Sequence, residues 1–422
     1  MSAARLGCIA DDFTGATDLA SQLVSAGMRV VQTIGVPDTP LETDCDAVVV
    51  SLKSRTVAPS EAVRHSLRAL EWLRGVGCER FFFKYCSTFD STPQGNIGPV
   101  ADALLGALGE DFTLAVPSLP ANRRTVYNGY LFAGDVLLNE SGMQDHPLTP
   151  MRDAFLPRVL QPQTRRPVGL VSHHALAEGA AGVRRRIAEL RAQGVGIAVC
   201  DTLDHGDLVS IAEGSADLRL LTGGSGLGLT LPATFPGFAP RGDAARLDPI
   251  GGRALVVAGS CSRATLAQID HAKAQMPAHS VDVDALFTGF DAHVDSLVAF
   301  AASNAGEGPV LIHAGMAPER LREVQTCYGT AESGERVERA LAKVAQRLVR
   351  ENGVRRVLVA GGETSGAVVE ALGVTGLRIG PTIDPGVPWT QSVGSPEPLA
   401  LALKSGNFGG VDIMNRAFEI MP

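Results

Sequence analysis

Two adjacent carboxylates, Asp11 and Asp12, stand directly after a short apolar run at residues 6–10. The run has the composition of a buried strand, and residues 14–26 carry leucines at helical spacing. Two carboxylates at the end of a buried strand are costly to desolvate unless a cation, a metal ion or a substrate hydroxyl offsets their charge. The pair therefore predicts a ligand site. The alternative is that one aspartate only caps the following helix, and the two roles are compatible.

Polar side chains also stand at the ends of later predicted strands: Arg55 after residues 46–52, Lys84 and Asp90 after residues 81–83, and Asn122 after residues 113–116. The carboxyl ends of parallel strands share one edge of a sheet, where ligands bind at the point of strand reversal. We therefore expect these side chains to gather beside Asp11 and Asp12. Taken singly, Arg55 or Lys84 is more often a solvated surface charge than a ligand contact.

The bulk composition limits the class of protein. The 422 residues are too many for one ordinary core and predict two domains, and 45% hydrophobic with 19% charged residues predicts a folded globular chain. The net charge of -8, without a Lys/Arg-rich run, argues against a nucleic-acid partner. The seven cysteines are scattered singly, which removes C-x-x-C zinc and redox motifs and predicts a cytoplasmic location. We find no signal-peptide pattern and no apolar run long enough to span a membrane.

Apolar runs alternate with amphipathic stretches along the chain, which predicts an α/β fold with largely parallel sheets flanked by helices. Residues 232–252 are rich in proline and glycine and show little periodicity. We therefore expect a linker at residues 236–252 between a domain at 1–235 and a domain at 253–422. Residues 127–150 predict a long loop, or a short hairpin followed by a loop.

Three turns of small residues follow three strands predicted in the second half, at residues 259–260, 361–364 and 405–410. Glycine lets a backbone approach a ligand closely, and helix N-termini favour phosphate. Several such turns at one sheet edge predict a site for a nucleotide polyphosphate. A further glycine-rich turn, at 222–228, lacks both the Walker A lysine and a full dinucleotide spacing, so tight-turn geometry explains it as well as anion binding does.

Several of these stretches resemble the four-carbon acid sugar kinases over nearly the whole chain, from about residue 6 to about residue 412. The matching motifs are residues 9–16 (IADDFTGA), Lys84 with 90–92 (DST), 95–98 (GNIG), 361–366 (GGETSG) and 404–409 (KSGNFG). Residues 83–92 and 146–150 look most like the branch that acts on 3-oxo-tetronate. The branches that act on D-threonate and D-erythronate have a shorter stretch after the lysine.

The resemblance implies ATP-dependent phosphorylation of the 4-hydroxyl of a 3-oxo-tetronate. It implies a sugar-acid-binding domain at 1–235, a nucleotide-binding domain at 253–422 and an active site in the cleft between them. Mg²⁺ would accompany ATP. The ATP contacts carried over from the family are Ser260, Gly361, Gly362, Glu363, Thr364 and Gly406.

For this chemistry we assign Asp12 to accept the hydroxyl proton, with Asp11 orienting it or helping to hold Mg²⁺, and these two roles are exchangeable. Arg55 and Lys84 would clamp the substrate carboxylate or the transferring phosphoryl group. Further substrate contacts are expected from Asp90 and Asn122.

Three alternatives stay open at this point. A kinase of D-threonate or D-erythronate would use the same motifs. A phosphatase with an aspartyl nucleophile usually has Asp-x-Asp, whereas Asp11 and Asp12 are adjacent. A non-catalytic sugar-acid sensor would not need three nucleotide-type turns. The expected partners are a small sugar acid and ATP, without nucleic acid or membrane, and a homodimer is one option for the oligomeric state.

Overall fold

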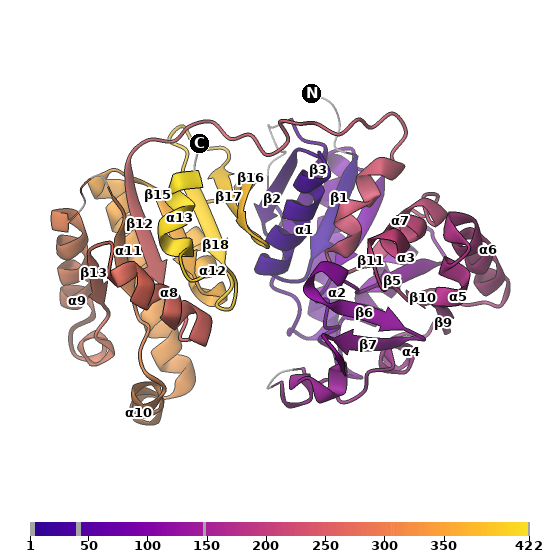
Figure 1. The fold of residues 1–422 in the computed structure, drawn as a ribbon, viewed down its shortest axis with the longest axis horizontal. Coiled ribbons are helices and arrows are strands. Elements are labelled where there is room, and N and C mark those ends of the chain that lie inside the picture. Colours follow the sequence, from indigo (N-terminus) through magenta and orange to yellow (C-terminus); the bar gives the residue numbers. More distant parts are fainter. Residues whose placement is uncertain (1–4, 39–43, 147–148, 305, 307, 421–422) are drawn as a thin grey trace. The chain divides into compact units, whose positions relative to one another are not determined.

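The computed structural model describes residues 5–38, 44–146, 149–304, 306 and 308–420. Within the motif at 146–150, Pro147 and Leu148 lie outside the described residues. The chain divides into two compact units, Met1–Ala245 and Arg246–Pro422. Each unit is a sheet flanked by helices (Figure 1), so the α/β prediction is confirmed.

The N-terminal unit is built on a parallel sheet with its strands in the order β2-β3-β1-β4-β11-β5-β10-β9. These strands are β1 (Leu6–Ala10), β2 (Val30–Ile34), β3 (Ala47–Ser51), β4 (Arg80–Lys84), β5 (Thr113–Val116), β9 (Val168–Val171), β10 (Ile197–Cys200) and β11 (Leu220–Gly223). Strand β1 lies between β3 and β4 and is buried throughout, which is why it is a continuous apolar run. The chain leaves β1 for β2 and β3 on one side and then crosses to β4 on the other. The strand order therefore reverses beside β1, where open α/β sheets bind ligands.

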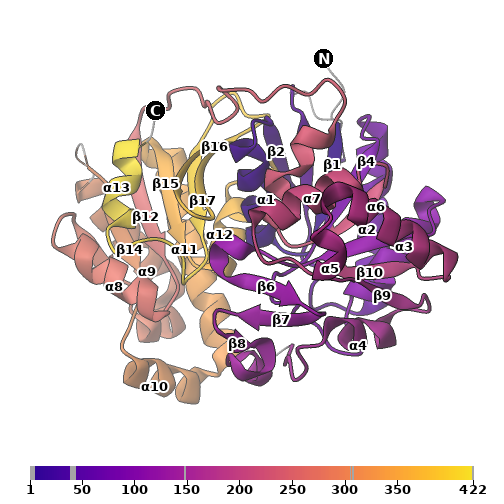
Figure 2. The ribbon, with the colours of Figure 1, turned by 45° about the vertical axis from the view of Figure 1, so that its right-hand side comes forward.

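Helices cover this sheet, and a small hairpin sheet lies outside it. The helices are α1 (Phe13–Ser25), α2 (Pro59–Gly75), α3 (Ile97–Leu108), α4 (Leu156–Leu160), α5 (His173–Leu176), α6 (Gly179–Ala192) and α7 (His205–Gly214). The hairpin sheet is antiparallel and consists of β6 (Arg124–Tyr127), β7 (Tyr130–Ala133) and β8 (Val136–Leu137), as Figures 1 and 2 show. Of the two predictions for residues 127–150, the hairpin followed by a loop is confirmed.

The C-terminal unit has its strands in the order β13-β14-β12-β15-β18-β17-β16. They are β12 (Arg253–Ala258), β13 (Ala278–Ser280), β14 (Val310–His313), β15 (Val354–Ala360), β16 (Gly376–Asp384), β17 (Val387–Ser392) and β18 (Ala400–Lys404). The first four and β18 run parallel, whereas β16 and β17 form an antiparallel pair that the sequence analysis did not predict. The helices are α8 (Arg263–Lys273), α9 (Val283–Asn304), α10 (Pro318–Tyr328), α11 (Thr330–Asn352), α12 (Gly362–Ala371) and α13 (Ile413–Ile420).

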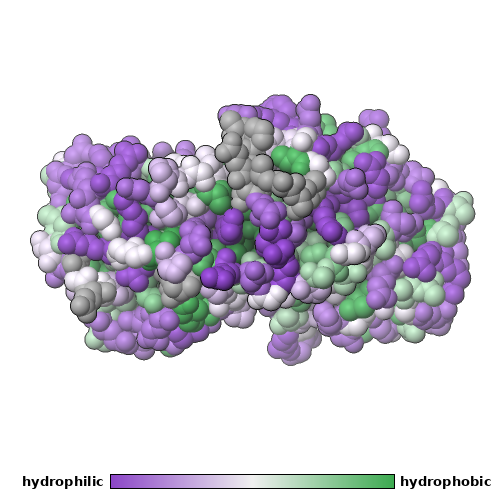
Figure 3. Space-filling view, turned by 90° about the horizontal axis from the view of Figure 1, so that it is seen from above, coloured by the Kyte–Doolittle hydropathy of each residue, from purple (hydrophilic) through white to green (hydrophobic). Residues whose placement is uncertain are grey.

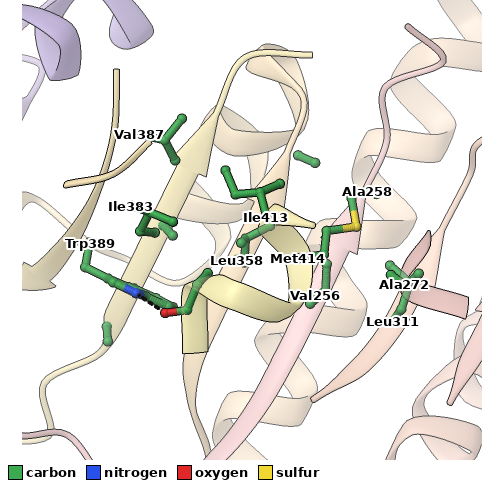
Figure 4. Packing of buried hydrophobic residues seen from close by; sticks show 14 of the residues in the cluster. Val256, Ala258, Ala272, Leu311, Leu358, Ile383, Val387, Trp389, Ile413 and Met414 are labelled. Carbon is green, nitrogen blue, oxygen red and sulfur yellow. Dashed lines mark hydrogen bonds between the residues drawn. The ribbon is translucent and has the colours of Figure 1, made fainter. Parts of the chain in front are cut away.

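A buried cluster fixes α8 and α13 against this second sheet (Figure 4). Val256 and Ala258 of β12 face the same side as Ala272 of α8 and Met414 of α13. Trp389 of β17 is fully buried, and its indole Nε1 donates a hydrogen bond of 2.8 Å to the carbonyl of Ala417. Because β18 precedes residues 405–410 and α13 follows them, this packing holds both ends of that glycine-rich turn.

The segment predicted as a linker contains no α-helix or strand between residues 235 and 252 of the described chain. The backbone of Arg241 donates to the carbonyl of Gly27 in the N-terminal unit at 3.1 Å, whereas Leu247 and Ile250 are buried in the core of the C-terminal unit. Each end is therefore anchored to its own unit.

One face of the molecule shows how polar and apolar side chains are distributed. The face drawn in Figure 3 is mostly hydrophilic, with hydrophobic side chains scattered over it. Within the described residues, no helix combines the length and the apolar character needed to cross a bilayer.

Candidate active site

One guanidinium holds both carboxylates that follow β1. Arg55 donates from Nε to Asp11 Oδ2 at 2.9 Å and from Nη2 to Asp11 Oδ1 at 2.7 Å. The same Nη2 donates to Asp12 Oδ1 at 2.7 Å. Asp11 is only 6% exposed, so its charge is compensated by a two-pronged ion pair rather than by water. These hydrogen bonds use the guanidinium nitrogens Nε and Nη2. The third nitrogen, Nη1, donates to neither aspartate.

The strand register brings these residues together. Ala10, the last residue of β1, pairs with Ser51 of β3 and with Lys84 of β4. The backbone N–H of Asp11 then donates to the carbonyl of Lys84 at 3.0 Å, and the N–H of Ser54 donates to the carbonyl of Asp11 at 2.9 Å. The polar residues that end or follow the adjacent strands β1, β3 and β4 therefore lie side by side at the carboxyl edge of the sheet, as expected.

The electrostatics of the pair are set by burial and by mutual attraction. Burial raises the pKa of Asp11, and the attraction of Arg55 only partly opposes that rise. Burial also disfavours the Arg55 cation, but the carboxylates of Asp11 and Asp12 outweigh it and raise the pKa of the guanidinium. Arg55 therefore stays charged, and the surroundings of Asp11 increase the proton affinity of its carboxyl group.

Asp12 caps a helix and also pairs with Arg55. It is the N-cap of α1, where its Oδ1 accepts from the N–H of Gly15 at 3.0 Å and its Oδ2 accepts from Thr14 Oγ1 at 3.0 Å. The same Oδ1 also accepts from Arg55. Helix capping and ion pairing with Arg55 are therefore combined in one carboxylate.

Lys84 lies at the start of the same helix. It is 3% exposed, and its Nζ donates to the carbonyl of Tyr85 at 2.7 Å. A Cβ atom added at Gly15 would lie 3.2 Å from this Nζ and 2.2 Å from Asp12 Oδ1. Gly15 thus leaves the space that the ammonium and the carboxylate occupy, a role that the sequence analysis did not assign.

Asp90 belongs to the polar turn after β4. Thr88 Oγ1 donates to Asp90 Oδ1 at 2.6 Å and lies 2.9 Å from the sulfur of Cys86. Burial raises the pKa of the Cys86 thiol to about 11, Asp90 adds to the rise, and Arg55 and Lys84 oppose it. Asp90 is therefore close to the same charged cluster.

Asn122, which was predicted to lie at the cluster, lies away from it, whereas Asn96, for which no role was predicted, supports it. Asn122 ends a short 3₁₀ turn and is exposed, and none of its contacts among the described residues reaches the cluster. Asn96, which the sequence analysis quoted only within a motif, donates from Nδ2 to the carbonyls of Ser54, Arg55 and Val57 at 2.8, 3.2 and 3.0 Å. Its position just before α3 resembles a cap, but its side chain instead fixes the loop that carries Arg55.

The glycine-rich turns of the C-terminal unit also converge. Ser262 Oγ and Thr265 Oγ1 donate to the carbonyl of Gly406 at 2.7 and 2.8 Å. A Cβ atom added at Gly406 would lie 2.4 Å from Ser260 Oγ, and one added at Gly361 would lie 3.0 Å from Thr364 Oγ1. Only glycine lets these backbones approach so closely.

The remaining residues of this second cluster lie at the start of α12. Gly361 is its N-cap, with φ of 131°, a conformation that other residues rarely adopt. Gly362 and Glu363 are exposed in the first turn, and Thr364 is buried. The free N–H groups of a helix start are thus presented beside the Ser260 and Gly406 turns.

Comparison with known proteins supports both halves of this arrangement. A family model described as a sugar-binding N-terminal domain matches residues 6–231, and one described as a nucleotide-binding C-terminal domain matches residues 255–414. A 3-oxo-tetronate kinase of Burkholderia multivorans is 56% identical over 419 residues, which span 99% of this chain and 97% of that relative. The chain belongs to the four-carbon acid sugar kinase family.

Other members of the family agree in sequence and in fold. A 3-oxo-tetronate kinase of Pseudomonas fluorescens is 57% identical over 417 residues, covering 98% of this chain and 96% of the relative. A Salmonella typhimurium LT2 protein, provisionally described as a tRNA synthase, has a crystal structure with a TM-score of 0.92 and 43% identity. That match covers 99% of this chain and 100% of the other. The family fold therefore extends over both compact units.

Proposed function

We propose that this protein is an ATP-dependent kinase that phosphorylates the 4-hydroxyl of 3-oxo-tetronate. The assignment of the substrate rests on the sequence identity of 56% and 57% to relatives named 3-oxo-tetronate kinase, over nearly the full length of each chain. The two clusters of the structure support the reaction class. Phosphoryl transfer needs positioned charge and a phosphate-binding backbone more than covalent chemistry.

We assign nucleotide binding to the C-terminal unit, at Ser260, Gly361, Gly362, Glu363, Thr364 and Gly406. Their backbones converge, and the start of α12 points its free N–H groups toward the same turns. A cavity of about 100 Å³ adjoins them, lined by Gly259, Cys261, Ala314 and Met316 among others. We propose that this largely apolar cavity receives the base.

We assign the sugar acid to the N-terminal unit. Lys84 and the Nη1 group of Arg55 are the cations that would hold its carboxylate or the phosphoryl group, and Asp90 is a further substrate contact. Asn122 is not retained as a substrate contact, because it is exposed and none of its contacts among the described residues reaches the cluster. We keep Asp12 as the acceptor of the hydroxyl proton, because both oxygens of Asp11 accept from the charged guanidinium of Arg55, whereas Asp12 Oδ2 accepts, among the described residues, only from the neutral hydroxyl of Thr14. Asp11 then orients Arg55 and, through it, Asp12.

Mg²⁺ fits this arrangement as a companion of ATP. No cluster of three or more carboxylate, histidine or cysteine side chains that could hold a metal exists in the described part of the chain. Mg²⁺ is commonly held by one or two carboxylates together with substrate phosphates. Glu363, exposed at the nucleotide turn, would supply such a carboxylate, and the ion would neutralise phosphate charge there.

A matched substrate panel tests the proposal. Release of ADP is measured with 3-oxo-tetronate, D-threonate and D-erythronate, and without any acid. We expect ADP release to require the acid and kcat/KM to be highest with 3-oxo-tetronate. Higher kcat/KM with D-threonate or D-erythronate would assign the protein to another branch of its family. Release of phosphate from a sugar-acid phosphate without ATP would indicate a phosphatase, and binding without turnover would indicate a sensor.

The physiological setting follows from the same proposal. We propose a cytoplasmic enzyme whose partners are ATP and a sugar acid, since ATP is supplied in that compartment. A homodimer is compatible with this function, and sedimentation analysis of the purified chain would establish the oligomeric state.

A further inference from the structure

A buried lysine lies beneath the nucleotide turns of the C-terminal unit. Lys404 is the last residue of β18 and is 0% exposed. Its side chain points to the α8 face of the sheet, where Nζ donates to Thr265 Oγ1 at 3.2 Å and to the carbonyl of Gly406 at 3.3 Å. Both distances are at or beyond the long end of the usual range for such bonds.

Within the described part of its own unit, the ammonium of Lys404 lacks a buried carboxylate as counter-charge. Among described residues 246–420, no aspartate or glutamate is buried, and Lys404 is the only buried lysine or arginine. Its acceptors are also shared, because the carbonyl of Gly406 already accepts from Ser262 and Thr265 at shorter distances. Burial lowers the pKa of Lys404 to about 8. An uncompensated buried cation is costly unless an anion arrives to pair with it.

Lys404 contacts two of the three turns and the helix that follows the third. Its backbone carbonyl accepts from the N–H of Gly361 at 2.9 Å, and its side chain reaches Gly406 and the first turn of α8. The first turn of α8 carries the positive end of that helix dipole, which disfavours a neighbouring cation and favours an anion. The lysine, the helix start and the glycine N–H groups all produce positive potential at one place.

We propose that the buried ammonium of Lys404 supplies the fixed positive charge that binds the phosphates of the nucleotide at the Gly406 turn. The inference rests on the proposed kinase function and adds a residue to it. Lys404 is a positioning and charge-supplying residue that acts from beneath the turn. The nucleotide phosphates provide the counter-charge that no buried carboxylate supplies among described residues 246–420.

Calorimetric titration of the full-length protein tests this inference. ATP, ADP, adenosine and inorganic tripolyphosphate are titrated into the wild type and into Lys404→Met and Lys404→Gln, since the glutamine keeps N–H donors for Thr265 and Gly406 without the charge. Lys273→Met, at the exposed far end of α8, is the matched control. Thermal unfolding without nucleotide shows whether each variant is folded.

We expect ATP to bind at least about 30-fold more weakly to both Lys404 variants, ADP to lose less, and adenosine to change by less than about 2-fold. The melting temperature without nucleotide should not fall in Lys404→Met, because the substitution removes an uncompensated buried charge. Lys273→Met should bind all four ligands like the wild type.

Two outcomes would overturn the inference. Unchanged ATP affinity in the Lys404 variants would show that the charge does not act on phosphate. Equal losses of affinity for ATP and adenosine would show that Lys404 has only a structural role. Failure of the wild type to bind ATP would instead contradict the proposed function, and Lys404-dependent binding of tripolyphosphate would then still support the inference.

Discussion

Both carboxylate oxygens of Asp11 accept hydrogen bonds from one side chain, that of Arg55, and the same guanidinium reaches Asp12. The geometry depends on a planar fork, which arginine has and lysine lacks. The orientation of the two aspartates therefore depends on a residue 43 positions away in the chain from Asp12.

Replacing Arg55 by lysine should keep the charge and lose the fork. We expect kcat to fall about 10- to 100-fold and the free energy of unfolding to fall by about 1–3 kcal/mol. The measurements are steady-state kinetics and thermal unfolding. Arg166→Lys is the matched control, because Arg166 pairs with Asp102 in the same unit outside the cluster. A control variant with the same loss of kcat would show that the effect is general.

Asp12→Asn separates capping from chemistry. Asparagine is as good an N-cap as aspartate, so the cap on α1 should survive and the melting temperature should change by only about 2–4 °C. We expect turnover with the sugar acid to be lost, because asparagine cannot accept the hydroxyl proton. Asp204→Asn makes the same change at the N-cap of α7 and should leave kcat unaltered. Wild-type kcat in Asp12→Asn would remove this residue from the mechanism.

Lys84→Met should impair use of the sugar acid far more than binding of ATP. The ammonium is buried beside Gly15 and Asp12, so its removal should cost about 2–5 kcal/mol in kcat/KM for the acid. Kinetics with the acid and calorimetry with ATP measure the two effects separately. Lys343→Met, which removes a partly exposed lysine of the other unit, is the control. Loss of ATP binding with normal use of the acid would assign Lys84 to the nucleotide instead.

The buried Lys404 predicts a pH dependence of stability. Its pKa is about 8 in the folded protein against 10.5 in the unfolded reference, so the unfolded state binds more protons between these values. The contribution of Lys404 is therefore unfavourable below pH 8 and is relieved as the pH rises toward 10.5, by up to about 3 kcal/mol. The buried imidazole of His313 in the same unit has a pKa lowered by burial to about 4, so it stays neutral in this range and does not contribute to the pH dependence.

The measurement is the difference in melting temperature between the wild type and Lys404→Met, without nucleotide, from pH 7 to pH 10. Lys404→Met should be the more stable at pH 7, and its advantage should shrink as the pH rises. A constant difference over this range would contradict a lowered pKa for Lys404.

Features of the fold that depend on a local sequence pattern can be predicted well from the sequence. Strand β1 and the cap at Asp12 depend on an apolar run and a residue type, so the prediction of both is confirmed. The gathering of Arg55 and Lys84 beside Asp11 follows from the rule for parallel strand ends, and the strand register confirms it.

What the sequence does not reveal depends on contacts distant in the chain. Asn96 resembles a helix cap, and only the folded loop shows its amide bound to three carbonyls. Lys404 follows five apolar residues just as Lys84 follows three phenylalanines, and a strand-end lysine is usually a surface charge. The antiparallel pair β16–β17 was missed because its register is set by partners across the sheet rather than by its own alternation.

The most direct test of the kinase assignment is the position of the phosphate in the product. The protein is incubated with ATP, Mg²⁺ and 3-oxo-tetronate, and the product is examined by phosphorus NMR without proton decoupling. A phosphate on the terminal 4-hydroxyl couples to the two protons of C4 and gives a triplet, whereas one on the 2-hydroxyl couples to a single proton and gives a doublet. We predict the triplet, appearing in step with ADP; a doublet, or ADP without any new phosphomonoester, would contradict the account.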